Sequence, residues 1–106
     1  SLDLAEIKKP EFSEPEFELF PCLRYAYEAG IAGGTLPAVM NAANEIAVYA
    51  FLEKKIRFLD IQRLIREMME EHNLIKNPGL KDILEIDKKT KEETNKIVEE
   101  ELIVEN

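Results

Sequence analysis

The chain has 106 residues, which is the size of one domain with a single hydrophobic core. Hydrophobic residues make up 45% and charged residues 34%, which is typical of a soluble globular domain. The 22 Asp and Glu residues outnumber the 14 Lys and Arg, and the resulting net charge of −8 argues against nucleic acid as a partner because phosphate backbones are repelled.

The sequence also argues against membrane insertion and secretion. No apolar run approaches the ~20 residues that a membrane-spanning helix needs. The start, SLDLAEI, lacks the basic and apolar regions of a signal peptide. Cys22 is the single cysteine and cannot form an internal disulfide, which fits a reducing compartment. We therefore expect a cytoplasmic protein without a membrane partner. The missing initiator Met indicates a processed chain or a piece of a longer one.

Residues 1–16 are predicted to form an extended connecting arm, followed by a helical domain over residues 17–106. Leu2 and Leu4 alternate with polar residues, and Pro10 and Pro15 interrupt any helix. An arm of this kind often connects a domain to another part of its chain.

Two helices are predicted next. The first runs from Pro21 to Gly30, with proline in the first turn and glycine as the C-terminal cap. Its expected apolar face contains Leu23, Ala26, Tyr27 and Gly30, with Cys22 at the edge. The second starts at Thr35 as N-cap and ends near Lys54 or Lys55. It is apolar almost all round and rich in alanine, which is typical of a central helix.

The remaining residues predict two further helices. Residues 59–71 carry apolar side chains in the full i, i+3, i+4, i+7, i+8 pattern. After a turn at Asn77-Pro78-Gly79, residues 80–86 are ambiguous between a helical turn and a strand, and we favour the turn. The last helix is expected to start at Asp87 as N-cap and to end near Ile103. The fold class is therefore all-α, a four-helix bundle with an extended N-terminal arm.

The glycine-rich stretch GIAGGT at residues 30–35 has two interpretations. A phosphate-binding loop needs GxGxxG after a strand, or a glycine loop followed by a Walker lysine. Gly30, Gly33 and Gly34 have neither spacing nor context. Punctuation between two helices fits these residues better, although a helix N-terminus always offers N–H donors to an anion.

Asn41, Asn44 and Glu45 form the most unusual polar group in the sequence. The spacing places all three on one side of the second helix. Asparagine is a poor helix former, so two in a nearly apolar helix indicate specific hydrogen bonds. The commoner use would tie this helix to a loop or to the arm. The alternative is a contact with another domain, and for a functional role we single out these three residues.

No complete catalytic or metal-binding set is apparent in the sequence. His72 is the only histidine, and with Glu70 and Glu71 it lacks the spaced ligands of a metal site, so we expect a solvated helix end. Cys22 has no histidine near it in sequence to act as a base. Met68 and Met69 are expected to fill gaps in the core.

The chain closely resembles the C-terminal domain of 1-deoxy-D-xylulose 5-phosphate reductoisomerases. Five segments carry the resemblance in one register over almost the whole chain: LDL at 2–4, FPCLRYAYEAG at 20–30, NAANE at 41–45, AFLEKKIRFLDI at 50–61 and DILEID at 82–87. Leu59 departs from the Thr that many members have, which leaves Asp60 as the candidate cap for the third helix.

The resemblance implies a parent enzyme that rearranges 1-deoxy-D-xylulose 5-phosphate and reduces the product with NADPH to 2-C-methyl-D-erythritol 4-phosphate, in the non-mevalonate route to isoprenoids. It implies Mg²⁺ or Mn²⁺, a homodimer, and N-terminal and central domains as partners of this one. The family's cofactor, metal and substrate residues lie upstream of the matched region, so none is assigned here. We expect no bound cofactor and no activity for this chain alone.

Two other classes of function remain open from the sequence. One is a free-standing acidic helical module that binds a protein partner. The other is a nucleotide-binding domain that uses GIAGGT.

Overall fold

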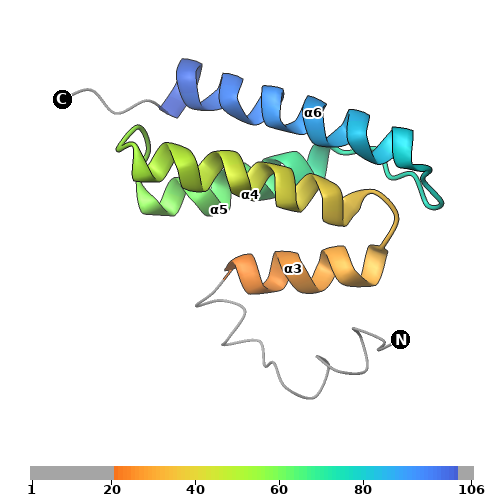
Figure 1. The fold of residues 1–106 in the computed structure, drawn as a ribbon. Helices are drawn as coiled ribbons and strands as arrows, with labels where there is room; N and C mark the ends of the chain where they lie inside the picture. Colours follow the sequence, from red (N-terminus) through yellow and green to blue (C-terminus); the bar gives the residue numbers. More distant parts are fainter. Residues whose placement is uncertain (1–20, 103–106) are drawn as a thin grey trace.

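The computed structural model describes residues 21–102, and every regular element in that range is helical (Figure 1). The elements are α3 (Pro21–Ala32), α4 (Leu36–Leu52), α5 (Phe58–Glu71), α6 (Leu80–Ile97) and a π-helical turn, η1 (Val98–Leu102). This confirms the predicted all-α fold of four helices. The predicted arm over residues 1–16 lies outside the described residues. Among residues 21–102, none of the helices combines the length and the apolar composition of a membrane-spanning segment.

Helix α4 is the centre of the bundle. It packs against α3 on one side, α6 on the other and α5 behind it (Figure 1). Its buried positions are small, which lets the neighbouring helices come close. They are Val39, Ala42, Ala43, Ala47 and Ala50. Leu64 and Ile65 of α5 and Val98 of η1 are fully buried against this set.

Helix α3 differs from the prediction in its end and in its buried face. It continues through Gly30 to Ala32, so Gly30 is a helix residue and no cap. The chain turns instead at Gly33 and Gly34, whose φ angles are +65° and +55°. Cys22, Tyr25 and Ala29 face the core, whereas Ala26 of the predicted face is exposed. The prediction of one apolar face on this helix is correct. The face that packs against the core is rotated around the helix axis from the predicted one.

Helix α5 begins close to its predicted start. The Arg57 N–H donates to Oδ2 of Asp60 at 2.8 Å, so the buried Asp60 carboxylate satisfies a backbone donor that the helix leaves free. Asp60 therefore supports this helix end, as expected from the departure at Leu59, but from the third helical position.

Helix α6 is longer than predicted. It starts at Leu80 and passes through Asp87 without interruption, so residues 80–86 are helical and Asp87 is an interior residue. The helix start is stabilised by Asp82, whose Oδ2 accepts the Gly79 N–H at 2.9 Å. Thr90, Thr94, Val98 and Leu102 form the buried stripe that continues into η1.

Candidate functional site

The outer face of α4 carries the predicted polar residues among exposed apolar ones. Asn41, Asn44 and Glu45 are all exposed. Tyr49 and Leu52 follow them with 63% and 68% of their surface exposed, which is unusual for large apolar side chains on a central helix. Together with Val48, all except Asn41 line a shallow hollow of about 400 Å³. We call Asn41, Asn44, Glu45, Val48, Tyr49 and Leu52 the α4 outer face. The sequence predicted this side of α4 to be covered, and within residues 21–102 it is open.

The three polar residues of this face have different surroundings. Within the described part of the chain, no side-chain hydrogen bond involves Asn41 or Asn44, so they do not tie α4 to a loop there. Glu45 forms an ion pair with Lys91 of α6 at 2.9 Å, and Asp87 lies 3.0 Å from the same ammonium. The hydrogen bonds that the Lys91 ammonium donates to the Glu45 and Asp87 carboxylates raise the pKa of Lys91. Glu45 therefore joins α4 to α6, while both asparagines keep their amide groups available.

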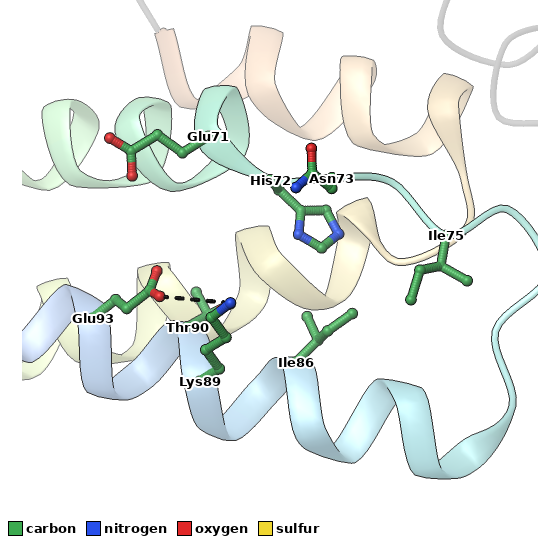
Figure 2. A pocket seen from close by; sticks show the side chains of 8 residues that line it. All are labelled: Glu71, His72, Asn73, Ile75, Ile86, Lys89, Thr90 and Glu93. Atoms are coloured by element: carbon green, nitrogen blue, oxygen red, sulfur yellow. Dashed lines mark ion pairs between the residues drawn. The ribbon is translucent and has the colours of Figure 1, made fainter.

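A second polar site lies where α5 ends, and the sequence did not reveal it. The His72 ring projects from the end of α5 into a hollow of about 370 Å³ that α6 closes from the other side (Figure 2). Nε2 of His72 lies 2.6 Å from Oγ1 of Thr35, and that hydroxyl also accepts the Ile75 N–H at 3.0 Å. His72 therefore ends α5 as predicted, but its ring is partly buried and hydrogen-bonded and is not a free, solvated side chain. Thr35 and His72 are 37 residues apart, and no spacing rule connects them.

The surroundings of His72 favour the neutral imidazole. Burial lowers the pKa of His72, and the nearby Lys89 ammonium lowers it further. Lys89 itself pairs with Glu93 at 3.9 Å on the same helix, as the dashed line in Figure 2 shows. A neutral histidine in this position accepts one hydrogen bond and donates another.

The glycine turn is filled by the chain's own backbone. The Thr35 N–H donates to the Ile75 carbonyl at 3.0 Å. A Cβ on Gly34 would overlap that carbonyl oxygen and would lie 3.1 Å from Cα of Lys76. Gly34 thus allows two connections of the bundle to touch, which is the punctuation role predicted for this stretch. The Thr35 N–H, which a phosphate at the start of α4 would need as a donor, is already bonded to the Ile75 carbonyl.

The described residues do not supply a metal or thiol centre. Between residues 21 and 102, no three His, Cys, Asp or Glu side chains are grouped to hold a metal ion. Cys22 is half-buried, and burial raises the pKa of its thiol, which keeps it in the less reactive protonated form.

Comparison with known proteins decides the family. Residues 1–93 match the sequence profile of the DXP reductoisomerase C-terminal domain. The chain belongs to this family. The match favours an enzyme domain over a free-standing binding module.

Individual DXP reductoisomerases show how much of such a protein the chain covers. It is 56% identical over 90 residues to 1-deoxy-D-xylulose 5-phosphate reductoisomerase 2 of Bacillus anthracis, which is 85% of this chain and 24% of that protein. The reductoisomerase of a Synechococcus strain is 46% identical over 99 residues, 93% of this chain and 25% of its own length. The chain thus spans about a quarter of the length of the curated relatives it matches.

A solved DXP reductoisomerase has the same fold in its matching part. The enzyme from Zymomonas mobilis, in complex with NADPH, aligns with a TM-score of 0.73 and 40% sequence identity. The alignment covers 94% of this chain and 26% of the enzyme. The helical bundle therefore corresponds to one quarter of a larger protein, which implies further domains.

Proposed function

We propose that this chain is the C-terminal helical domain of an NADPH-dependent reductoisomerase that converts 1-deoxy-D-xylulose 5-phosphate to 2-C-methyl-D-erythritol 4-phosphate in isoprenoid biosynthesis. Its own role is structural. The bundle packs against the N-terminal and central domains of the same polypeptide and holds the loops of the substrate site in position. The parent enzyme acts as a homodimer in the cytoplasm.

The observation that carries the structural role is the α4 outer face, while the reaction of the parent enzyme is proposed from the family. A central helix normally buries its apolar side chains, yet Tyr49 and Leu52 remain open beside Asn44 within residues 21–102. Apolar side chains beside amide groups without partners are typical of a surface that another protein segment covers. Because the chain spans a quarter of its relatives, the preceding domains are the natural occupant.

The chemistry of the parent reaction is assigned to those preceding domains. The glycine turn does not fit the phosphates of NADPH, because the space at Gly34 is filled by the backbone at Ile75 and the Thr35 N–H is already bonded. Nor do they fit Mg²⁺ or Mn²⁺, since residues 21–102 contain no cluster of carboxylates with the required geometry. We accordingly propose that the isolated domain has no catalytic activity of its own.

Asn44→Ala in the full-length enzyme tests the scaffold role. The amide is exposed and unpaired within residues 21–102. The free energy of unfolding of the isolated 106-residue variant should therefore differ from that of wild type by no more than about 0.5 kcal/mol. In the full-length enzyme we expect kcat/KM to fall, by up to about 100-fold, because small displacements far from the reacting atoms misplace the substrate groups. Steady-state kinetics and thermal unfolding of both proteins provide the measurement.

Asn95→Ala is the matched control, because Asn95 is exposed on α6 and lies outside the α4 outer face. It should leave kcat, KM and stability unchanged. If Asn44→Ala behaves like this control in the full-length enzyme, the α4 outer face is not the contact that positions the active site.

A further inference from the structure

We propose that Thr35 and His72 form a pH-sensitive latch that fastens the connection between α5 and α6 to the start of α4. The inference concerns the bundle alone and does not depend on the proposed function. It starts from three hydrogen-bonded contacts at one point: His72 Nε2 to Thr35 Oγ1 at 2.6 Å, the Ile75 N–H to Thr35 Oγ1 at 3.0 Å, and the Thr35 N–H to the Ile75 carbonyl at 3.0 Å.

The direction of the hydrogen bonds follows from the chemistry of the hydroxyl. A threonine hydroxyl has one hydrogen and two lone pairs. The Ile75 N–H can only donate, so it occupies one lone pair of Oγ1. Thr35 has no exposed surface, and within residues 21–102 His72 Nε2 is the one group placed to accept the hydroxyl hydrogen. The arrangement that satisfies every group has Thr35 donating to an unprotonated Nε2, with the ring hydrogen of His72 on Nδ1.

Protonation of His72 removes this arrangement. Both ring nitrogens of an imidazolium are donors, so Nε2 would point a hydrogen at an oxygen that already accepts one from Ile75. The hydroxyl hydrogen would then lose its acceptor in a buried position, which is unfavourable. The Ile75 N–H donates to that same oxygen, so its hydrogen bond weakens together with the histidine contact. The Thr35 N–H then remains as the one bond between Thr35 and the Ile75 backbone.

The charged groups around His72 do not compensate for this loss. Glu71 of α5 and Lys89 and Glu93 of α6 line the same hollow (Figure 2). Glu93 is paired with Lys89, and within residues 21–102 no ion pair joins His72 to either carboxylate. Burial and Lys89 both hold the pKa of His72 below its ordinary value.

The sign of the pH effect follows from that direction. A histidine whose pKa is lower in the folded than in the unfolded chain contributes its full stabilisation above the unfolded pKa of about 6.5. The contribution is lost as the pH falls from there to the folded pKa. The latch is therefore closed at neutral pH and opens on acidification.

NMR spectroscopy can test the latch directly, because His72 is the only histidine in the chain. In the 106-residue protein, long-range ¹H–¹⁵N spectra should show the hydrogen on Nδ1 at neutral pH. The imidazole should titrate with a midpoint below about 6.5. Through that titration the hydrogen-exchange protection factor of the Ile75 amide should fall, while that of Ala47, in the middle of α4, should not.

Two variants of Thr35 separate the hydroxyl from its surroundings. Thr35→Val removes the donor and should raise the His72 midpoint toward its ordinary value, whereas Thr35→Ser keeps the hydroxyl and should retain the wild-type midpoint. A hydrogen on Nε2 at neutral pH, a wild-type midpoint at or above about 6.5, or constant Ile75 protection through the titration would each overturn the latch. These three readouts use the wild-type protein, so they decide the question even if Thr35→Val does not fold.

Discussion

At the scale of single residues, the two turn glycines have different surroundings despite similar backbone angles. Gly33 and Gly34 both have positive φ angles, which residues with a Cβ rarely adopt. A Cβ on Gly33 would meet open space, whereas on Gly34 it would collide with the backbone at Ile75. The turn therefore needs glycine twice, for backbone conformation at both positions and for space at the second.

Gly34→Ala should consequently be far more destabilising than Gly33→Ala. We expect about 1 kcal/mol for Gly33→Ala, which is the penalty of left-handed backbone for a residue with a Cβ. Gly34→Ala adds the collision and should lower the free energy of unfolding by about 3 kcal/mol or more. Urea unfolding of the two variants and wild type provides the comparison. Equal losses would mean that the contact between Gly34 and Ile75 is not formed in solution.

The residues of the candidate site were only partly predictable from the sequence. Helical spacing placed Asn41 and Asn44 on one face of α4, and it did so correctly because their positions depend on a single element. The partners of Glu45 and Thr35 lie on other helices, at Lys91 and His72. Such pairs depend on how elements pack, and spacing within an element carries no information about that.

At the scale of elements, α4 ends in a common C-terminal capping motif whose left-handed position is occupied by an unusual residue. The Lys54 N–H donates to Phe51 O and the Lys55 N–H to Ala50 O, both at 2.9 Å, which is the Schellman pattern. The residue in the left-handed position is Lys54, with φ of 64°, where glycine is the usual choice.

Lys54→Gly should therefore stabilise the bundle. Relief of the left-handed strain outweighs the greater freedom of glycine in the unfolded chain, and the expected gain is about 0.5–1 kcal/mol. Lys54→Ala is the control, because it removes the charge but keeps the Cβ. Its free energy of unfolding should equal that of wild type. Thermal unfolding measures both. A loss of stability in Lys54→Gly would show that the lysine side chain contributes more than its backbone strain.

Helix boundaries were predicted less well than helix identity. Asp87 suits an N-cap, but the N-cap of α6 is Gly79, so the predicted start is eight residues late. In the structure Asp87 pairs with Lys91 one turn later, and Lys81 pairs with Glu85 in the same way. Such pairs support a continuous helix. The start of α6 is instead marked by Asp82, three residues after Gly79. Its carboxylate accepts the Gly79 N–H, whereas glycine has no side chain to cap the helix in return.

At the scale of the whole molecule, stability depends on α5 packing its buried stripe against α4. Met68 lies in that stripe with 4% of its surface exposed, while its neighbour Met69 is only partly buried. Because the two methionines are adjacent in the sequence but differ in burial, substituting each in turn tests which face of α5 packs against the core. The burial expected of Met68 from the sequence is confirmed.

Met68→Ala should lower the free energy of unfolding by about 2–5 kcal/mol, because it leaves a cavity in the core. Met69→Ala should have a clearly smaller effect, since its side chain is less buried. Chemical denaturation of the 106-residue chain measures both. If Met69→Ala proves the more damaging change, α5 is rotated in solution relative to the structure.

The tie between Ile75 and Thr35 also controls where proteases can attack the bundle. The connection from α5 to α6 is mostly exposed, and exposed connections are the preferred places for nicking. Cleavage requires a stretch of backbone that can lift away into an enzyme's cleft. Because both the N–H and the carbonyl of Ile75 are bonded to Thr35, the connection is divided, and the longer exposed stretch is residues 76–79. At neutral pH we therefore expect a protease that cuts after lysine to cleave first at Lys76, and loss of the bonds between Ile75 and Thr35 to extend cleavage by other proteases back toward His72.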